Sequence, residues 1–182
     1  MRVAELWRYP VKSLRGERLD RVELERDGFR GDRLTRVLGP DGSHVTGRTA
    51  PGLLGLEAGI GARGEPLVDG EPWDSEAAGE RIEAVAALGE DRRRLRPNVV
   101  VEGVAGLGER DWVGRRLRLG PAELLVREPC ERCVMTTIDP DTLEIRPDVL
   151  RRINDDFEGL MGVYCEVALP GTIQDGDPVE LH

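Results

Sequence analysis

The chain has 182 residues, enough for one domain or for two small halves that pack as one unit. Its 35 acidic and 26 basic residues give a net charge of -9, which argues against partners such as nucleic acid or an anionic membrane. No apolar run approaches the ~20 residues of a membrane span. Three cysteines, an odd number, give no disulfide framework. We therefore expect a soluble protein in a reducing cytoplasm.

Short strands separated by glycine and proline are predicted along most of the chain. Alternation of apolar and polar residues or short apolar runs mark these segments. The predicted strands are residues 3–8, 21–25, 34–38, 98–101, 115–119, 122–126, 162–169 and 179–181. Turns are expected at residues 39–42, 69–70 and 174–177. Many short strands with few helices favour a closed or nearly closed barrel.

Two helices are predicted. Residues 75–88 place Ala78, Ile82, Val85 and Ala86 on one face, with Gly89 as the stop, and residues 147–157 place Val149, Leu150, Ile153 and Phe157 on one face. The fold class is thus α/β but β-rich: a distorted, mostly antiparallel β-barrel with a few short helices. A seam near residues 89–94 divides it into residues 1–88 and 89–182, which we expect to pack as one compact unit.

The most informative segment begins at Pro129 and carries Cys130, Arg132 and Cys133 on one predicted loop between two strand-like runs. A thiolate ligates soft metals and attacks electrophiles once its pKa falls below about 8.5, and a guanidinium nearby favours the charged form. A Cys-x-x-Cys pair is also typical of half a zinc site, of a redox pair or of two small buried residues. The chemistry of this loop therefore stays open at this point.

The rest of the sequence weakens the zinc and redox interpretations. A structural zinc site needs four ligands, and only Cys165, His44 and His182 remain as further cysteine or histidine ligands. A thioredoxin-like dithiol precedes a helix, whereas residues 134–138 are β-branched and are predicted to form a strand. A thiolate on a strand-edge loop suits coordination of a bound cofactor or a covalent sulfur intermediate.

Four other places carry donors that an anion site would need. Lys12 and Ser13 follow a strand-breaking proline, Arg33 follows two glycines, Arg96 stands beside Asn98, and Arg132 lies in the cysteine loop. Each also has a structural interpretation: a strand-end turn, a pair between Arg33 and Asp32, or a mostly solvated arginine run at residues 92–94. Taken one at a time, these residues do not define a site.

Together the motifs resemble the MOSC family, the molybdenum cofactor sulfurase C-terminal domain, in order along nearly the whole chain. The N-terminal β-barrel region is carried by Leu6-Trp7-Arg8-Tyr9-Pro10-Val11-Lys12-Ser13-Leu14, Gly31-Asp32-Arg33 and Thr46-Gly47-Arg48. The domain proper is carried by Arg96-Pro97-Asn98, Trp112-Val113-Gly114, Arg132-Cys133-Val134-Met135-Thr136-Thr137-Ile138-Asp139-Pro140 and Tyr164, with the closing Pro170-Gly171-Thr172-Ile173 and Gly176-Asp177-Pro178-Val179. Within the family, the pattern is similar to amidoxime-reducing components and their bacterial counterparts.

The resemblance implies a molybdenum cofactor with a single pyranopterin dithiolene. Cys133 rather than Cys130 would be the thiolate on molybdenum, and the residues around the pterin and its phosphate would be Lys12, Ser13, Arg33, Arg96, Asn98, Arg132 and Tyr164. The chain departs from the family pattern in its short middle section, where Ser75 is the one hydroxyl candidate. It also stops at His182, without the ferredoxin-like extension that some relatives carry.

The function implied is reduction of N-hydroxylated or N-oxide compounds by oxygen-atom abstraction, with a small-molecule substrate and a separate electron-donor protein. The alternative is a sulfur carrier or sulfurtransferase that holds a persulfide on Cys133. A third possibility is a non-catalytic carrier of the cofactor.

Overall fold

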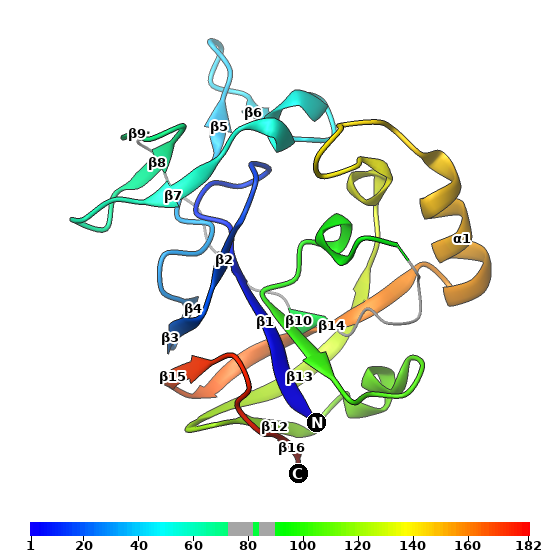
Figure 1. Ribbon diagram of the computed structural model, residues 1–182. Coiled ribbons are helices and arrows are strands. Elements are labelled where there is room, and N and C mark those ends of the chain that lie inside the picture. Colours follow the sequence, from blue (N-terminus) through cyan, green and yellow to red (C-terminus); the bar gives the residue numbers. More distant parts are fainter. Residues whose placement is uncertain (73–81, 84–89) are drawn as a thin grey trace.

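A computed structural model describes residues 1–72, 82–83 and 90–182 (Figure 1). The largest sheet has eight strands in the order β16 (Val179–Leu181), β12 (Arg116–Leu119), β13 (Ala122–Glu131), β14 (Leu160–Leu169), β10 (Ile82–Glu83), β11 (Val99–Glu102), β1 (Arg2–Arg8) and β2 (Glu17–Leu19). Neighbouring strands are antiparallel, except that β10 and β11 are parallel. The sheet therefore combines strands from both halves of the chain.

Three smaller sheets complete the β-structure. They are β15 (Gly171–Gln174) with β3 (Arg21–Glu25) and β4 (Gly28–Phe29), then β5 (Val37–Leu38) with β6 (His44–Val45), and β7 (Ala58–Ile60) with β8 (Pro66–Val68) and β9 (Glu71–Pro72). The one α-helix of the described residues is α1 (Pro147–Phe157). Short 3-10 helices span Pro51–Gly55, Arg92–Leu95, Gly108–Trp112 and Val134–Thr137.

The large sheet curves so that β1, next to one edge, approaches β16 at the other edge. The Val3 N–H donates to the Asp177 carbonyl at 2.9 Å, and the Val179 N–H donates to the Met1 carbonyl at 3.0 Å. Among the described residues this contact stays local and does not become a continuous ladder. The predicted β-rich fold of mostly antiparallel strands is confirmed, but the strand order is that of an open sheet.

Period-two alternation explains the main core. In β12 the leucines Leu117 and Leu119 are fully buried while Arg116 and Arg118 are exposed, because successive side chains point to opposite faces of a strand. The core strands of the large sheet and of the β15–β3–β4 sheet bury their apolar faces against one another. A second cluster forms where α1 places Val149 and Ile153 against Leu95 and Met161. This second cluster supports the segment that precedes Arg96.

Several local predictions were wrong. Residues 134–137 form a 3-10 helix instead of a strand, and β13 continues to Glu131, so that Cys130 lies in a strand and is fully buried. Arg94 is buried, not solvated. The predicted helix 75–88 contains strand β10 at Ile82–Glu83, and its other residues lie outside the described ones. The helix at 147–157 is confirmed, as are the strands at 21–25 and 179–181.

Candidate functional site

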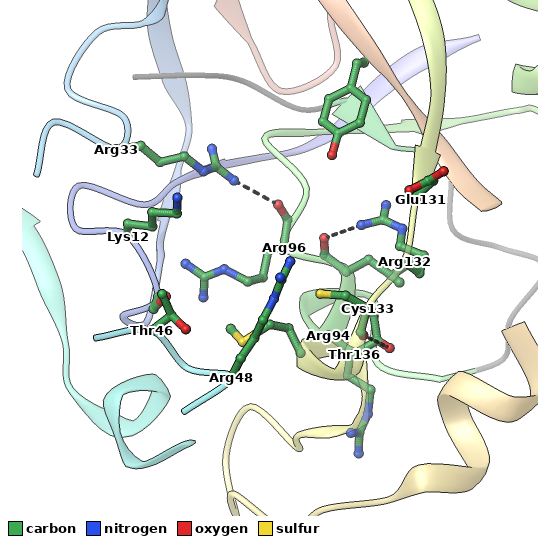
Figure 2. A pocket seen from close by; sticks show the side chains of 14 residues that line it. Lys12, Arg33, Thr46, Arg48, Arg94, Arg96, Glu131, Arg132, Cys133 and Thr136 are labelled. Atoms are coloured by element: carbon green, nitrogen blue, oxygen red, sulfur yellow. Dashed lines mark hydrogen bonds between the residues drawn. The ribbon is translucent and has the colours of Figure 1, made fainter. Parts of the chain in front are cut away.

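A cavity of about 380 Å³ lies between the N-terminal turns and the segment that follows β13 (Figure 2). That volume is in the range of small-molecule sites. Its lining residues are Lys12, Ser13, Arg33, Thr46, Arg48, Arg94, Leu95, Arg96, Glu131, Arg132, Cys133, Met135, Thr136 and Tyr164. Seven of the eight residues selected from the sequence are in this set, and Asn98 is the exception. Six cations and one carboxylate therefore line one cavity of an acidic protein.

Cys133 is partly exposed and lies two residues after the end of β13, at the start of the 3-10 helix Val134–Thr137. The Thr136 N–H and hydroxyl both donate to the Cys133 carbonyl, at 3.0 and 2.9 Å, which fixes the turn that carries the thiol. In Figure 2 Cys133 lies on the opposite wall from Lys12 and Arg33. The described residues contain no group of three or more His, Cys, Asp and Glu side chains suited to hold a metal.

Asn98 does not line the cavity itself but holds one of its residues, Arg33, in place. It is fully buried, and its side-chain carbonyl accepts a hydrogen bond from Arg33 Nη1 at 2.8 Å while its amide donates to the Trp7 carbonyl at 3.1 Å. Arg33 also pairs with Asp32. Arg33 is thus both a partner of Asp32, as its structural interpretation predicted, and a residue of the cavity wall. Its single guanidinium group contacts Asp32 and Asn98.

A tyrosine ring organises two of the cavity's arginines. The Arg96 guanidinium carbon lies 4.2 Å from the centroid of the Tyr9 ring and that of Arg33 lies 5.1 Å from it. Tyr9 is 3% exposed, so these cation–π contacts are shielded from water and hold both guanidinium groups in place. Gly16 permits this packing, because a Cβ atom there would lie 2.4 Å from Tyr9 Cε1.

Three cavity residues have left-handed backbone conformations that favour glycine. The φ angles are 74° at Ser13, 46° at Arg33 and 55° at Arg96. Non-glycine residues adopt this region at a cost of order 1 kcal/mol each, and such strain concentrates at functional sites. At these three positions the protein thus has a strained backbone conformation where a polar side chain lines the cavity.

Arg132 connects the cysteine segment to β14. Its Nε and Nη2 donate to the Met161 carbonyl at 2.9 and 2.7 Å, its Nη1 donates to the Leu95 carbonyl at 3.0 Å, and its N–H donates to the Gly159 carbonyl at 2.9 Å. Most of its donors therefore face backbone carbonyls. Arg132 positions Cys133, which follows it directly, in addition to lining the cavity.

The peptide group between Met161 and Gly162, whose carbonyl accepts from Arg132, also donates its N–H to the buried carboxylate of Glu109. Glu109 is fully buried, and its Oε1 accepts a hydrogen bond from the Gly162 N–H at 3.3 Å. The Met161 carbonyl and the Gly162 N–H belong to one peptide group, located where the β13–β14 register shifts and where Gly162 has a φ of 73°. Burial raises the pKa of the Glu109 carboxyl above its usual value, opposed by the Gly162 N–H and by the charges of Arg110 and Arg132.

We expect the Glu109→Gln variant to change how stability depends on pH. An acid whose pKa is raised by folding contributes stability that is fully present below its unfolded pKa, about 4.3, and that is lost as the pH rises through the folded value. The wild type should therefore lose stability relative to Glu109→Gln between about pH 4.5 and pH 7.5. Urea unfolding of both proteins at the two pH values measures this, and a constant difference would show that Glu109 does not titrate as described.

The sequence did not single out seven lining residues, Thr46, Arg48, Arg94, Leu95, Glu131, Met135 and Thr136. Thr46 and Arg48 were part of a resembling motif but had no assigned role. Arg94 is anchored in the wall, where Nη2 contacts Asp139 Oδ2 at 2.7 Å and Nη1 donates to the Thr137 carbonyl at 3.2 Å. Met135 packs on Gly47, where a Cβ atom would lie 2.6 Å from its terminal carbon. The glycine between Thr46 and Arg48 was the available signal for this close approach.

Comparison with protein families decides the relationship. The family model described as the MOSC domain matches residues 74–180, and that of the MOSC N-terminal beta barrel domain matches residues 1–86. The chain belongs to the MOSC domain family. Its resemblance to that family, seen first in the residue motifs, is confirmed. Within the described residues, no helix is long and apolar enough to cross a membrane.

Curated MOSC relatives match parts of the chain. A molybdenum cofactor sulfurase of Anopheles gambiae is 43% identical over 77 residues, covering 41% of this chain and 10% of the relative. Mitochondrial amidoxime-reducing component 1 of Mus musculus is 35% identical over 100 residues, covering 48% of this chain and 29% of the relative. The chain thus matches less than a third of the length of these proteins. The crystal structure of the YUAD protein from Bacillus subtilis superposes with a TM-score of 0.55 at 18% identity, over 99% of this chain and 94% of that one, which supports the fold.

The MOSC family is linked to the molybdenum cofactor through such relatives, so the cavity can be tested for its fit to that group. A phosphorylated pterin needs cations and hydroxyl donors, and the walls supply Lys12, Arg33 and Arg96 with Ser13 and Thr46. A soft metal needs a soft ligand, and the wall supplies Cys133. The residues present fit the group. Ser75, the hydroxyl residue of the short middle section, lies outside the described residues.

Proposed function

We propose that this MOSC protein binds a molybdenum cofactor in the cavity and reduces N-hydroxylated or N-oxide compounds. The observation that supports this most strongly is that one partly exposed thiol and six cationic side chains line the same cavity, whose volume suits a small molecule. Relatives named as amidoxime-reducing components support the reaction class. Cys133 would ligate the metal, and Lys12, Ser13, Arg33, Arg96 and Tyr164 would surround the pterin and its phosphate.

When bound, the cofactor supplies oxygen-atom transfer chemistry. The chain's own residues do the binding and positioning. Arg33 and Arg96 are held against Tyr9 and are directed at the cavity, so that little order has to be gained when an anion binds. Arg132 fixes the backbone on which Cys133 sits. Asn98 holds Arg33 in place, which makes it a positioning residue in this proposal.

The reaction sets a clear electron demand. Reduction of an amidoxime breaks one N–O bond and consumes two electrons and two protons, with the amidine and water as products. Those electrons must come from a separate donor, because the sequence shows no flavin, haem or iron–sulfur motif. We therefore propose a separate electron-donor protein as partner. We also propose the cytoplasm as the compartment, because the three cysteines are free thiols, which suits a reducing environment.

The reductase proposal has a direct test. Protein from a host that makes the cofactor should reduce benzamidoxime with reduced viologen as donor and should be inert with NADH alone. Metal analysis of the same sample should give molybdenum and one pterin per chain. Zinc at unit stoichiometry without molybdenum would reject the proposal.

A sulfur carrier is the second candidate, favoured by the partial exposure of Cys133 on a turn rather than inside a strand. In that case a cysteine desulfurase would transfer one sulfur atom to the Cys133 thiolate and form a persulfide, which dithiothreitol removes. Mass spectrometry of desulfurase-treated protein detects the gain. A stable persulfide that is absent from Cys133→Ala, together with no benzamidoxime reduction, would favour the carrier over the reductase.

A further inference from the structure

Most cavity cations are already engaged by the protein. Arg33 contacts Asp32 and Asn98, Arg94 contacts Asp139, and Arg132 donates to backbone carbonyls. These contacts fix the guanidinium groups in the wall. A ligand that enters the cavity can use their remaining donors, but it does not have to supply their main partners.

Arg48 is different. It is exposed, and across the part of the chain that the structure describes it forms no ion pair. Some exposed arginines pair with carboxylates, such as Arg30 with Glu23 and Arg127 with Glu166. Others, such as Arg151, form no ion pair among the described residues, but they do not line the cavity as Arg48 does. An arginine that lines a cavity without such a partner keeps its fork of donors available for an anion from solution.

The position of Arg48 is constrained. The Ala50 N–H donates to the Thr46 carbonyl at 2.8 Å and closes the turn that carries Arg48. Gly47, next to it, touches Met135, two residues beyond Cys133. Figure 2 shows Arg48 at the cavity together with Cys133. The turn is thus anchored on the cysteine segment, which keeps Arg48 near the thiol.

We propose that Arg48 forms an anion subsite at the mouth of the cavity and binds a carboxylate on the substrate. This rests on the proposed reductase function and names its substrate class, N-hydroxylated compounds that carry a carboxylate. The planar guanidinium matches a carboxylate with two parallel hydrogen bonds. Lys12, also exposed, adds a second positive charge to the same cavity and raises the local concentration of anions.

The test compares 4-carboxybenzamidoxime with neutral benzamidoxime in wild type and Arg48→Gln. The ratio of their kcat/KM values should fall about fivefold in the variant, the size expected for a partly solvated charge pair. Added salt should shrink the wild-type ratio, since exposed charges are screened. Arg48→Glu should prefer the cationic 4-aminomethylbenzamidoxime. Arg151→Gln, an exposed arginine on α1 outside the cavity, is the control with the same change in charge.

Two further measurements distinguish a carboxylate on the substrate from the phosphate of the cofactor as the anion that Arg48 binds. Molybdenum and pterin per chain should be equal in wild type and Arg48→Gln, and a loss of either would assign Arg48 to the cofactor's phosphate and overturn the proposal. Calorimetric binding of both compounds gives the same preference without turnover. If the wild type reduces neither compound, the reductase proposal fails, and the binding ratio still decides for or against the subsite. The subsite is rejected if the preference for 4-carboxybenzamidoxime over benzamidoxime is the same in Arg48→Gln as in the wild type.

Discussion

Replacing Cys133 by alanine is expected to remove molybdenum from the protein and to abolish reduction of benzamidoxime, while the protein stays folded. Cys133 is the thiol of the cavity, and it lies partly exposed on a turn whose hydrogen bonds come from Thr136 and not from sulfur. The loss of its side chain should change the free energy of unfolding by less than about 1 kcal/mol. Metal analysis, activity and urea unfolding together measure the three effects.

Cys130→Ala is the matched control, three residues away on β13. Cys130 is fully buried, so its truncation should leave a small cavity and lower the free energy of unfolding by about 1 kcal/mol, with molybdenum retained. If Cys130→Ala lost the metal and Cys133→Ala kept it, the choice of ligand would be wrong. A dithiol role would then have to be considered again.

Arg132→Met is expected to have the largest effect on stability. The methionine can fill the space of the arginine stem, but it leaves the Met161 and Leu95 carbonyls without these donors and removes a positive charge near buried Glu109. Loss of three charge-assisted hydrogen bonds, with two backbone carbonyls left without these donors, should lower the free energy of unfolding by about 3 kcal/mol. Urea unfolding at pH 7 measures this.

The same variant should change the behaviour of Cys133. With Arg132 gone, the segment after β13 is less firmly held to β14, and the thiol of the metal-free protein should be alkylated several-fold faster, as mass mapping of the modified cysteine can show. Arg127→Met is the control, because Arg127 lies on the same strand, is exposed and pairs with Glu166. It should cost less than about 1 kcal/mol and leave the alkylation of Cys133 unchanged.

The elements that the sequence predicted well are those whose pattern and burial agree. Helix α1 shows an apolar face at helical spacing, and β3 alternates between buried and exposed residues along its whole length. Strands β7, β8 and β9 have only two or three residues each and were not predicted, because so short a segment carries no period. Their formation depends on pairing with one another, which is a tertiary effect.

The segment after Cys133 illustrates why propensity failed at the site itself. Val134, Thr136 and Thr137 favour strands, but both threonine hydroxyls donate to carbonyls within their own turn, Thr136 to Cys133 and Thr137 to Val134, at 2.9 and 2.7 Å. Local hydrogen bonds therefore outweighed β propensity. The redox interpretation had been weakened by the predicted strand, and that part of the argument no longer holds.

The cavity as a whole could not be derived from residue types alone. Lys12, Arg33, Arg48 and Arg96 each have an ordinary structural interpretation, and only the tertiary fold gathers them around one thiol. Motif resemblance identified most of the set, since it compares residues in combination. It did not separate roles: Asn98 and Arg132 hold other parts of the site in place, as their hydrogen bonds show.

The positive φ angles at Ser13, Arg33 and Arg96 have a consequence for protein design. At Ser13, glycine would relieve the strain because no Cβ opposes the conformation, so selection for stability alone would favour loss of that hydroxyl from the cavity. At Arg33 the same change would remove the guanidinium that contacts buried Asp32 and Asn98, and at Arg96 it would remove the guanidinium stacked on Tyr9. Selection for stability and selection for ligand binding thus act in opposite directions at Ser13 and in the same direction at the two arginines.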